Sequence, residues 1–250
     1  MSIFSAIDIQ PLRERLSGWP TINASDLGEP YLLAKLLAAE GYASARMRVF
    51  FEPTEILPEA ATQAERDAFD EAEPPIPWAE EPGYPVDPEA FHNERWGLIQ
   101  ARHRPVIQIH SIKYVYPQPL TTVFDVPAEW IRIDRKYGQI SLLPGPVSAQ
   151  IPLWSLSLMG AGRVVPHVIQ VRYQAGLKNA RTKYPHLLDL LYRLALLGIL
   201  RDQFLPQSGS ISADGLSESA SFDLDKFGGQ LNSEIDALRD AILGIRMTVL

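Results

Sequence analysis

The side chains that could support chemistry in this chain are five histidines and one short glycine motif. No two histidines are four residues apart on an expected helix, so the pattern of a helical zinc site is missing. The segment "LMGAGRVV" contains G-x-G, but it has no third glycine and no expected helix behind it, as a phosphate-binding loop needs. We expect His110 and His167, which fall in expected strands, to be partly buried or surface residues rather than ligands. The five histidines are His92, His103, His110, His167 and His186.

The acidic pair Glu80–Glu81 is the remaining candidate for catalysis, because two carboxylates across a cleft can hydrolyse a glycosidic bond. The pair lies in a proline-rich acidic stretch, where we expect solvated surface. No serine lies in G-x-S-x-G, and the chain has no cysteine that could act as a nucleophile. We therefore predict a protein that is not an enzyme, with no catalytic residue, cofactor or metal. An enzyme with an acidic cleft stays open as an alternative.

Aromatic residues give a stronger signal than the titratable ones. Trp78, Tyr84 and Trp96 lie in or beside the acidic stretch, whereas Trp130 and Trp154 lie at or in expected strands. Buried aromatics are favoured anchors of protein–protein contacts. The first three residues are thus either candidates for contact with a partner or anchors that hold the stretch to its own domain.

Composition excludes several classes of protein. The 250 residues are 46% hydrophobic, which is enough for a sizeable core, and the formal net charge is -7. A general nucleic-acid binder needs a basic face, and no run of lysine or arginine supplies one. The chain shows no secretory signal and no stretch of about 20 apolar residues, so we expect a soluble intracellular protein without a membrane partner.

Two helices are expected before residue 45. Residues 9–16 form a short amphipathic stretch, and a stronger helix has Pro30 in its first turn. We expect Gly41 to lie just beyond the end of that second helix, followed by an extended segment beginning "ARMRVFFEPTEILP".

Residues 52–95 combine many acidic side chains with frequent prolines. Proline removes a backbone donor and interrupts both helices and sheets. We expect one short helix over residues 60–72 and otherwise irregular structure. The aromatics argue against simple disorder, and the stretch is interpreted as an arm lying on its own surface or on that of a neighbour.

The middle of the chain has the period of strands. In "VPAEWIRIDRKYGQISLLPG", Ile131 and Ile133 alternate with polar residues, residues 135–138 form a turn, and Ile140 and Leu142 continue the apolar face. Residues 107–116 shift phase by one, which predicts a bulge near Ser111. Two further strands are expected within 148–158 and 164–176.

Two helices are expected after residue 176. One begins with Pro185 as its first residue and carries a wide apolar stripe to Leu200. The other, over about 229–246, follows a Ser/Gly-rich linker at 206–227 and is expected to pack on the first. Its narrow stripe consists of Leu231, Ile235, Leu238 and Ile242.

These elements predict an α+β fold. Helices from both chain ends should pack as a small bundle, with a central antiparallel β-rich part and a long irregular acidic insertion. The expected divisions are an N-terminal helical segment (1–45), a β-rich part (46–175) and a C-terminal helical part (176–250).

A strand that ends in "VRYQAG" and leads to "YPHLLDLLYRLALLGIL" resembles the head–tail connector (adaptor) proteins of tailed bacteriophages. The stretch "YPQPLTTVFDVPAEWIRIDRKYGQISLLPG" and the tail "GLSESASFD…GG" are similar to phage structural proteins. The resemblance covers residues 105–245. The acidic insertion and the large β part depart from compact helical adaptors, so stopper, terminator, tail and baseplate proteins stay open as alternatives.

The resemblance implies a virion protein of the phage neck, assembled in the host cytoplasm, that forms a ring between the portal protein and the next neck or tail protein. It implies twelve copies in that ring and DNA that passes through without sequence-specific binding. A negative charge on the subunit would help the DNA to pass, because like charges repel its phosphates. It also implies that the C-terminal segment contacts the portal or a neighbouring subunit. The candidate contact residues there are Arg246, Met247, Thr248, Val249 and Leu250.

A free-standing β-rich module that binds a carbohydrate or a protein is the main alternative from another class. Exposed aromatics on a flat sheet face would favour it.

Overall fold

The computed structural model describes residues 2–18, 22–86, 98–117, 120–143, 164–204 and 224–244. The chain forms two compact units, which are treated separately. A helical unit contains Ser2–Arg48 and Asn179–Ala241, and a β unit contains mainly Val49–Lys178. Helices near both chain ends thus share one unit, and the sheets lie in the middle of the sequence. The predicted α+β class is confirmed.

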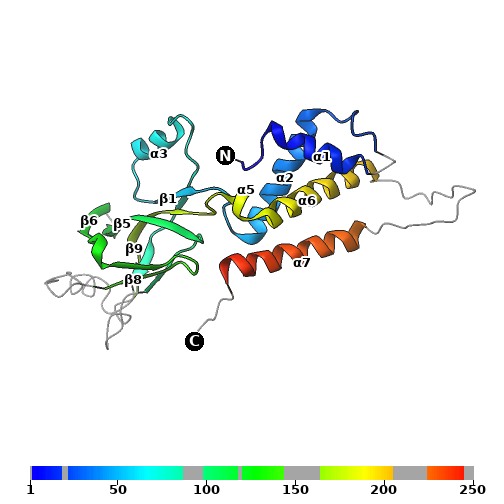
Figure 1. The fold of residues 1–250 in the computed structure, drawn as a ribbon. Helices are drawn as coiled ribbons and strands as arrows, with labels where there is room; N and C mark the ends of the chain where they lie inside the picture. Colours follow the sequence, from blue (N-terminus) through cyan, green and yellow to red (C-terminus); the bar gives the residue numbers. More distant parts are fainter. Residues whose placement is uncertain are drawn as a thin grey trace, which may run out of the picture. The chain divides into compact units, whose positions relative to one another are not determined.

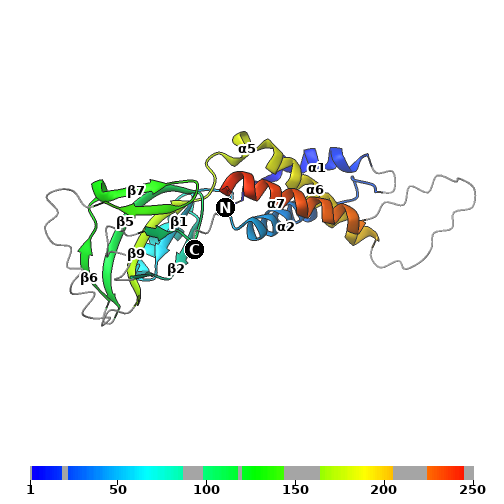
Figure 2. The same ribbon diagram turned by 90° about the horizontal axis from the view of Figure 1, so that it is seen from below.

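The helical unit is organised around α6, which the other helices of the unit surround (Figures 1 and 2). The side chains of α6 are therefore buried or half-buried along most of its length. None of the helices in the described part of the chain is both long and apolar enough to cross a membrane. The elements of the unit are η1 (Ala6–Asp8), α1 (Ile9–Leu16), α2 (Glu29–Met47), α5 (Ala180–Lys183), α6 (Pro185–Phe204) and α7 (Leu224–Leu243, within this unit up to Ala241).

Helix α2 is longer than the sequence predicts. It continues through Gly41 to Met47, and Arg48 caps it in the left-handed region, with φ 56°. Ala43 and Met47 are buried in the unit, so tertiary packing outweighs the weak helix propensity of one glycine. The prediction that Gly41 follows the helix end was wrong.

Helix α6 begins at Pro185, as expected. Helix α7 begins at Leu224 and ends at Leu243 rather than spanning 229–246. Its predicted stripe is buried at Leu231, Ile235 and Ile242 and half-buried at Leu238.

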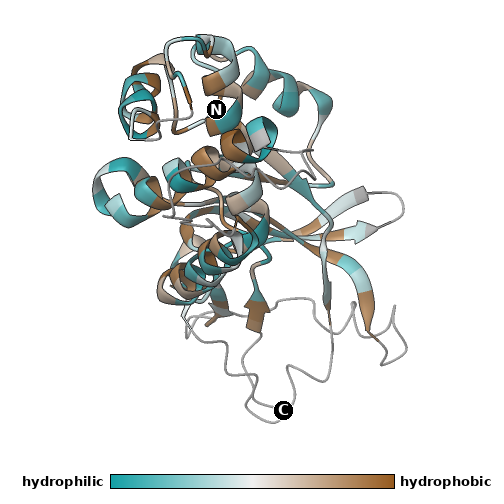
Figure 3. Ribbon diagram, turned by 90° about the vertical axis from the view of Figure 1, so that its right-hand side faces the viewer, coloured by the Kyte–Doolittle hydropathy of each residue, from teal (hydrophilic) through white to brown (hydrophobic). Residues whose placement is uncertain are grey.

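The described strands of the β unit form two sheets. The larger has the order β2-β1-β9-β5-β6, with β3 pairing on the β1 side of β9; the smaller has the order β4-β8-β7. Hydrophobic and hydrophilic residues alternate in bands along the strands (Figure 3). The strands are β1 (Thr54–Pro58), β2 (Trp78–Glu81), β3 (Tyr84–Val86), β4 (Leu98–Gln100), β5 (Val106–Pro117), β6 (Leu120–Asp125), β7 (Ile131–Asp134), β8 (Gln139–Leu142) and β9 (Val165–Ala175), with a short η3 at Ala128–Trp130.

The core of the β unit contains apolar residues of both sheets. Ile56, Ile112, Tyr114 and Tyr173 from the larger sheet belong to the same buried cluster as Ile140 from the smaller one. The inner face of the larger sheet is thus apolar. Its other face carries polar side chains such as Glu55 and Gln174, which alternate with the core residues Ile56 and Tyr173.

The hairpin β7–β8 forms as predicted. Ile131 pairs with Leu142 and Ile133 with Ile140, and all four belong to the apolar core or pack against it. The turn at residues 135–138 ends at Gly138, with φ 65°. The bulge near Ser111 is also confirmed, because the register of β5 against β9 shifts between Ile109 and Ser111.

The stretch expected to be an irregular arm is largely ordered within the β unit. It contains β1, the helix α3 (Gln63–Asp70), β2 and β3, and β1 pairs with β2 in parallel, so the β part is not wholly antiparallel. The prolines fit because Pro58 ends a strand and Pro85 lies in β3, which pairs on one side only. The short helix predicted within 60–72 is confirmed, with a capping box between Thr62 and Glu65.

Several predictions lie outside the described residues. These are the strand expected within 148–158, Trp96, Trp154, most of the linker at 206–227, and the C-terminal segment from Arg246 to Leu250.

Candidate interaction surface

The acidic pair of the sequence is divided between the two sides of strand β2. Glu80 is exposed and pairs with Arg66, with 3.0 Å between Nη2 and Oε2. Glu81 is only 2% exposed, and its Oε2 accepts a hydrogen bond of 3.0 Å from the Tyr173 hydroxyl. The expectation of solvated surface was therefore wrong for Glu81. Because adjacent strand residues point to opposite faces, the two carboxylates cannot act on one substrate.

Glu81 and its neighbours form a polar cluster, the Glu81 cluster, that holds the turn between β2 and β3. Burial raises the pKa of Glu81, although hydrogen bonds from Tyr84 and Tyr173 and the charge of Arg102 work against this rise. Arg102 donates to the carbonyl oxygens of Pro82 and Gly83, and its guanidinium carbon lies 4.2 Å from the centre of the Tyr84 ring. Because these partners are parts of the protein's own backbone and core, we interpret the cluster as structural.

The aromatic candidates in the described part of the acidic stretch have partners within the β unit. Tyr84 is buried in the core, and its hydroxyl accepts a hydrogen bond of 3.1 Å from the backbone N–H of Arg102. Trp78 is half-buried, and its Nε1 donates to Asp70 Oδ1 at 2.9 Å. These contacts hold strands β2 and β3 to the rest of the unit.

Two histidines pair with glutamates of the same unit. His110 Nε2 lies 3.1 Å from the Glu55 carboxylate, which also accepts a bond of 3.0 Å from Gln174. His167 Nδ1 lies 2.8 Å from Glu59 Oε1. Within the described residues, no three histidine, aspartate or glutamate side chains come close enough to hold a metal ion. Each pair links two segments of the β unit. Glu55 of β1 pairs with His110 of β5, and Glu59, which follows β1, pairs with His167 of β9.

Among its described residues, the helical unit has one buried carboxylate, Asp8, which is 2% exposed. Arg181 binds it with two hydrogen bonds of 2.7 and 2.8 Å, and the Tyr192 hydroxyl donates a third of 3.1 Å. Burial favours a higher pKa for Asp8, but the bonds from Arg181, the Ser5 backbone and Tyr192 outweigh it and lower that pKa. This Asp8 cluster fixes the η1 turn, because Asp8 also accepts a 2.8 Å bond from the Ser5 N–H.

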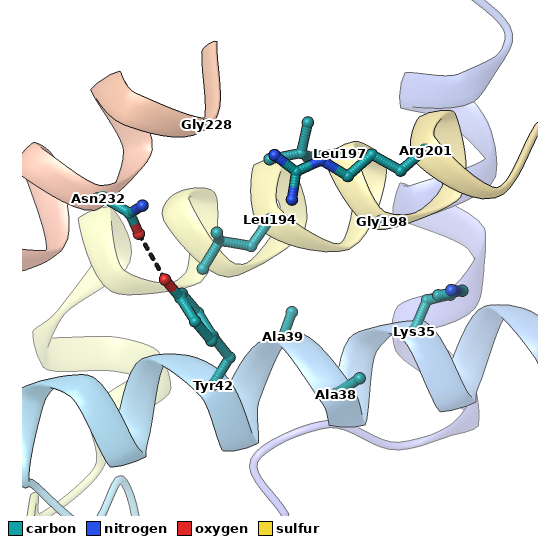
Figure 4. Close-up of a pocket in the computed structure, with 10 residues that line it drawn as sticks. All are labelled: Lys35, Ala38, Ala39, Tyr42, Leu194, Leu197, Gly198, Arg201, Gly228 and Asn232. Carbon is teal, nitrogen blue, oxygen red and sulfur yellow. Dashed lines mark hydrogen bonds between the residues drawn. The ribbon is translucent and has the colours of Figure 1, made fainter. Parts of the chain in front are cut away.

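A pocket of about 230 Å³ lies between α2, α6 and α7 (Figure 4). At one side of the pocket, the Tyr42 hydroxyl donates a hydrogen bond of 2.7 Å to Asn232 Oδ1 and so links α2 to α7. Its two cationic side chains have partners, since Lys35 pairs with Asp202 at 2.5 Å and Arg201 with Asp225 at 3.6 Å. Because its cations already have acidic partners and much of its lining is apolar, the pocket does not indicate a particular ligand. The lining residues are Lys35, Ala38, Ala39, Tyr42, Leu194, Leu197, Gly198, Arg201, Gly228 and Asn232.

Beside this pocket, α2 exposes a surface without charge, here called the α2 outer face. Its members recur three or four residues apart, so they share one side of the helix. Leu37 is 42% exposed although it is a large apolar residue. The α2 outer face consists of Ala34, Leu37, Ala38, Gly41 and Ala45, all of them exposed.

The sequence analysis did not single out the α2 outer face. A signal was present, because the four charged residues of α2 all lie on the other half of the helix at 100° per residue. They are Glu29, Lys35, Glu40 and Arg46. A second missed residue is Ile7, which is 81% exposed, the highest value among the large apolar residues of the described chain. Nothing in the sequence around Ile7 distinguishes it from a buried isoleucine.

Comparison with known proteins finds similarity in structure only. No protein-family model matches the chain, and no curated protein is significantly similar to it in sequence. A chain in the neck of an empty gene transfer agent (GTA) particle, computed with C6 symmetry, is similar with a TM-score of 0.45 and 14% identity over 100% of this chain and 96% of that one. A chain in the virion of the native GTA particle has a TM-score of 0.45 and 13% identity over 100% and 97%. Both neighbours are thus chains of a GTA particle.

Proposed function

We propose that this chain is a structural subunit of the neck of a phage-like particle, a head–tail adaptor that joins the portal to the tail. The observation that carries the proposal is the strand-to-helix step at residues 171–185, where the sequence resembles adaptors most. Strand β9 ends at Ala175, and α5 and α6 follow within ten residues.

The geometry of this step explains the glycine of "VRYQAG". Gly176 has φ 117°, and a Cβ there would lie 2.3 Å from the Glu52 carbonyl oxygen. Its N–H donates a bond of 2.9 Å to Pro105, and the next residue, Leu177, donates one of 3.0 Å to Phe50. Only glycine fits this position, so the motif has a structural reason in this fold.

The polar groups also support a structural role. The buried carboxylates Glu81 and Asp8 bind side chains and backbone of their own unit, and each holds a turn in place. The α2 outer face, by contrast, is suited to a protein partner. The most exposed tyrosines, Tyr42, Tyr116 and Tyr137, come from a helix, a strand end and a turn. Within the described residues, these tyrosines form no aromatic row along one strand, so carbohydrate binding has no specific support there.

The remaining details of the proposal follow the resemblance. The ring contains twelve copies, the portal is one partner, and the next neck or tail protein is the other. Residues Arg246–Leu250 contact the portal or a neighbouring copy, and DNA passes through without being read. Trp78 and Trp96 are further contact candidates, whereas Tyr84 is withdrawn because it is buried in the core of its own unit. Assembly takes place in the host cytoplasm.

Disruption of the gene in its phage tests the proposal. We expect DNA-filled heads without tails, together with free tails, and restoration of whole particles by the wild-type gene. Electron microscopy of the particles gives the readout. Tailed particles with an unchanged neck density in the disrupted strain would exclude the neck role.

A further inference from the structure

All four charged residues of α2 are used within the helical unit. Lys35 pairs with Asp202 at 2.5 Å, Arg46 with Asp236 at 2.7 Å, and Glu29 with Arg13 at 3.6 Å. The Glu40 carboxylate accepts a bond of 3.1 Å from the Ile3 N–H. The α2 outer face is therefore left with alanine, glycine and leucine over more than three turns, although a solvated helix face carries charged or polar residues.

Gly41 lies within this face and has no role in the fold of its own subunit. It has ordinary helical geometry, because it is not among the residues with positive φ. A Cβ placed on it would meet no atom within 4 Å, so no neighbour requires its small size. Glycine destabilises a helix interior relative to alanine. The residue leaves an open slot between Leu37 and Ala45 that a side chain from another molecule can enter.

Ile7 is the matching protrusion in the same unit. It is 81% exposed and lies in η1, the turn that the Asp8 cluster fixes through Ser5, Arg181 and Tyr192. An exposed isoleucine on a turn with a buried ion pair behind it is presented rigidly, so little conformational entropy is lost when it is bound. The residues beside it, Ser5 and Ala6, are uncharged and exposed. A partner of the uncharged α2 outer face must itself lack charge at the contact, because a charge buried there would be unpaired.

We propose that Ile7 of one copy packs into the slot at Gly41 of the next copy. The contact joins two different surfaces of the same unit, and such head-to-tail contacts generate rings or filaments rather than closed dimers. A second copy is the occupant that the chain itself supplies, with an apolar protrusion and an apolar slot on separate elements. The proposal rests on the proposed ring and identifies the two surfaces that would form it.

The test is a charge exchange in the full-length chain. Gly41→Glu places a carboxylate in the slot, and Ile7→Lys places an amine on the protrusion. We expect each single variant to weaken self-association about 100-fold, because an unpaired charge would be buried in an apolar contact. The double variant should regain much of that loss, because the two charges face each other across neighbouring copies. Sedimentation velocity gives the association constant, and circular dichroism checks that each variant is folded.

Gly229→Glu is the matched control. Gly229 is also an exposed glycine within a helix, and a Cβ there meets no atom within 4 Å. It lies on α7 and belongs to neither the α2 outer face nor η1, so the control should associate like the wild type. Loss of association with Gly41→Glu but not with Ile7→Lys would overturn the proposal, because it would mean that α2 packs against a surface that does not include Ile7.

The outcomes also separate this inference from the proposed function. Rings that form unchanged from both single variants overturn the Ile7–Gly41 contact and leave the neck role in place. A wild-type chain that neither self-associates nor binds the purified portal ring of its phage overturns both.

Discussion

The two units of this protein treat buried charge and exposed apolar surface differently. In the β unit, Glu81 is buried with Arg102 no closer than 4.0 Å, and its pKa is raised. In the helical unit, Asp8 binds Arg181 directly and its pKa is lowered. Both carboxylates hold a turn, but only the turn in the helical unit contains an exposed isoleucine, Ile7, and only that unit has the α2 outer face. The difference is that Glu81 is held mainly by hydrogen bonds to neutral groups, whereas Asp8 is held by a direct ion pair.

The largest expected effect comes from placing the same charge in each region. Ile140→Asp should prevent folding, because Ile140 is fully buried and an unpaired buried charge costs several kcal/mol, comparable to the roughly 5–15 kcal/mol that stabilises a domain. Ile133→Asp, on the facing strand, should act in the same direction. Ala45→Asp on the α2 outer face should change the stability of the monomer by less than about 1 kcal/mol. Thermal unfolding followed by circular dichroism measures all three.

A soluble Ile140→Asp variant with a cooperative transition would show that the core of the β unit is assigned wrongly. Unfolding caused by Ala45→Asp would show that the α2 outer face is covered within the chain itself.

The sequence predicts the parts of this fold that depend on local period. The alternation at Ile131, Ile133, Ile140 and Leu142 predicted a hairpin, and the phase shift near Ser111 predicted a bulge. Both patterns follow directly from the two-residue period of a strand. Such local signals gave the fold class without any long-range information.

Features that depend on distant partners were missed. The burial of Glu81 depends on Tyr173, 92 residues away, and the parallel pairing of β1 with β2 joins segments separated by a helix. The extension of α2 past Gly41 depends on packing of Ala43 and Met47, which outweighs propensity. The exposure of Ile7 likewise depends on the fold around η1, because an isoleucine is more often buried.

The second prediction concerns the dependence of stability on pH, to which the buried carboxylates Glu81 and Asp8 should contribute in opposite directions. The pKa of Glu81 is raised above its ordinary 4.5, so its charge destabilises the fold as pH rises through the folded-state value. Glu81→Gln should therefore gain stability relative to wild type between pH 4 and 7, by about 1 kcal/mol or roughly 2–4 °C in Tm. The melting temperature of variant and wild type across this range is the measurement.

Asp8→Asn is the counterpart in the helical unit. The pKa of Asp8 is lowered below 3.8, so its contribution is present above that pH and is lost as pH falls through the folded-state value. The variant should be less stable at pH 7 by about 2 kcal/mol, a moderate figure because water screens the half-exposed Arg181. Its deficit should shrink below pH 3.8. Parallel pH profiles for the two variants would contradict the contrast between the units.

The smallest change, Gly41→Ala, separates folding from association. Alanine is about 1 kcal/mol better than glycine in a helix interior, and its methyl group meets no atom of the same chain, so the monomer should become more stable by roughly 2–4 °C in Tm. The same methyl group partly fills the proposed slot for Ile7 and should weaken self-association by roughly tenfold. Gly229→Ala should give the same stabilisation without that loss. Opposite signs for stability and association at position 41 alone would mean that this glycine serves the contact between copies, whereas a variant that gains in both would remove the reason for a glycine there.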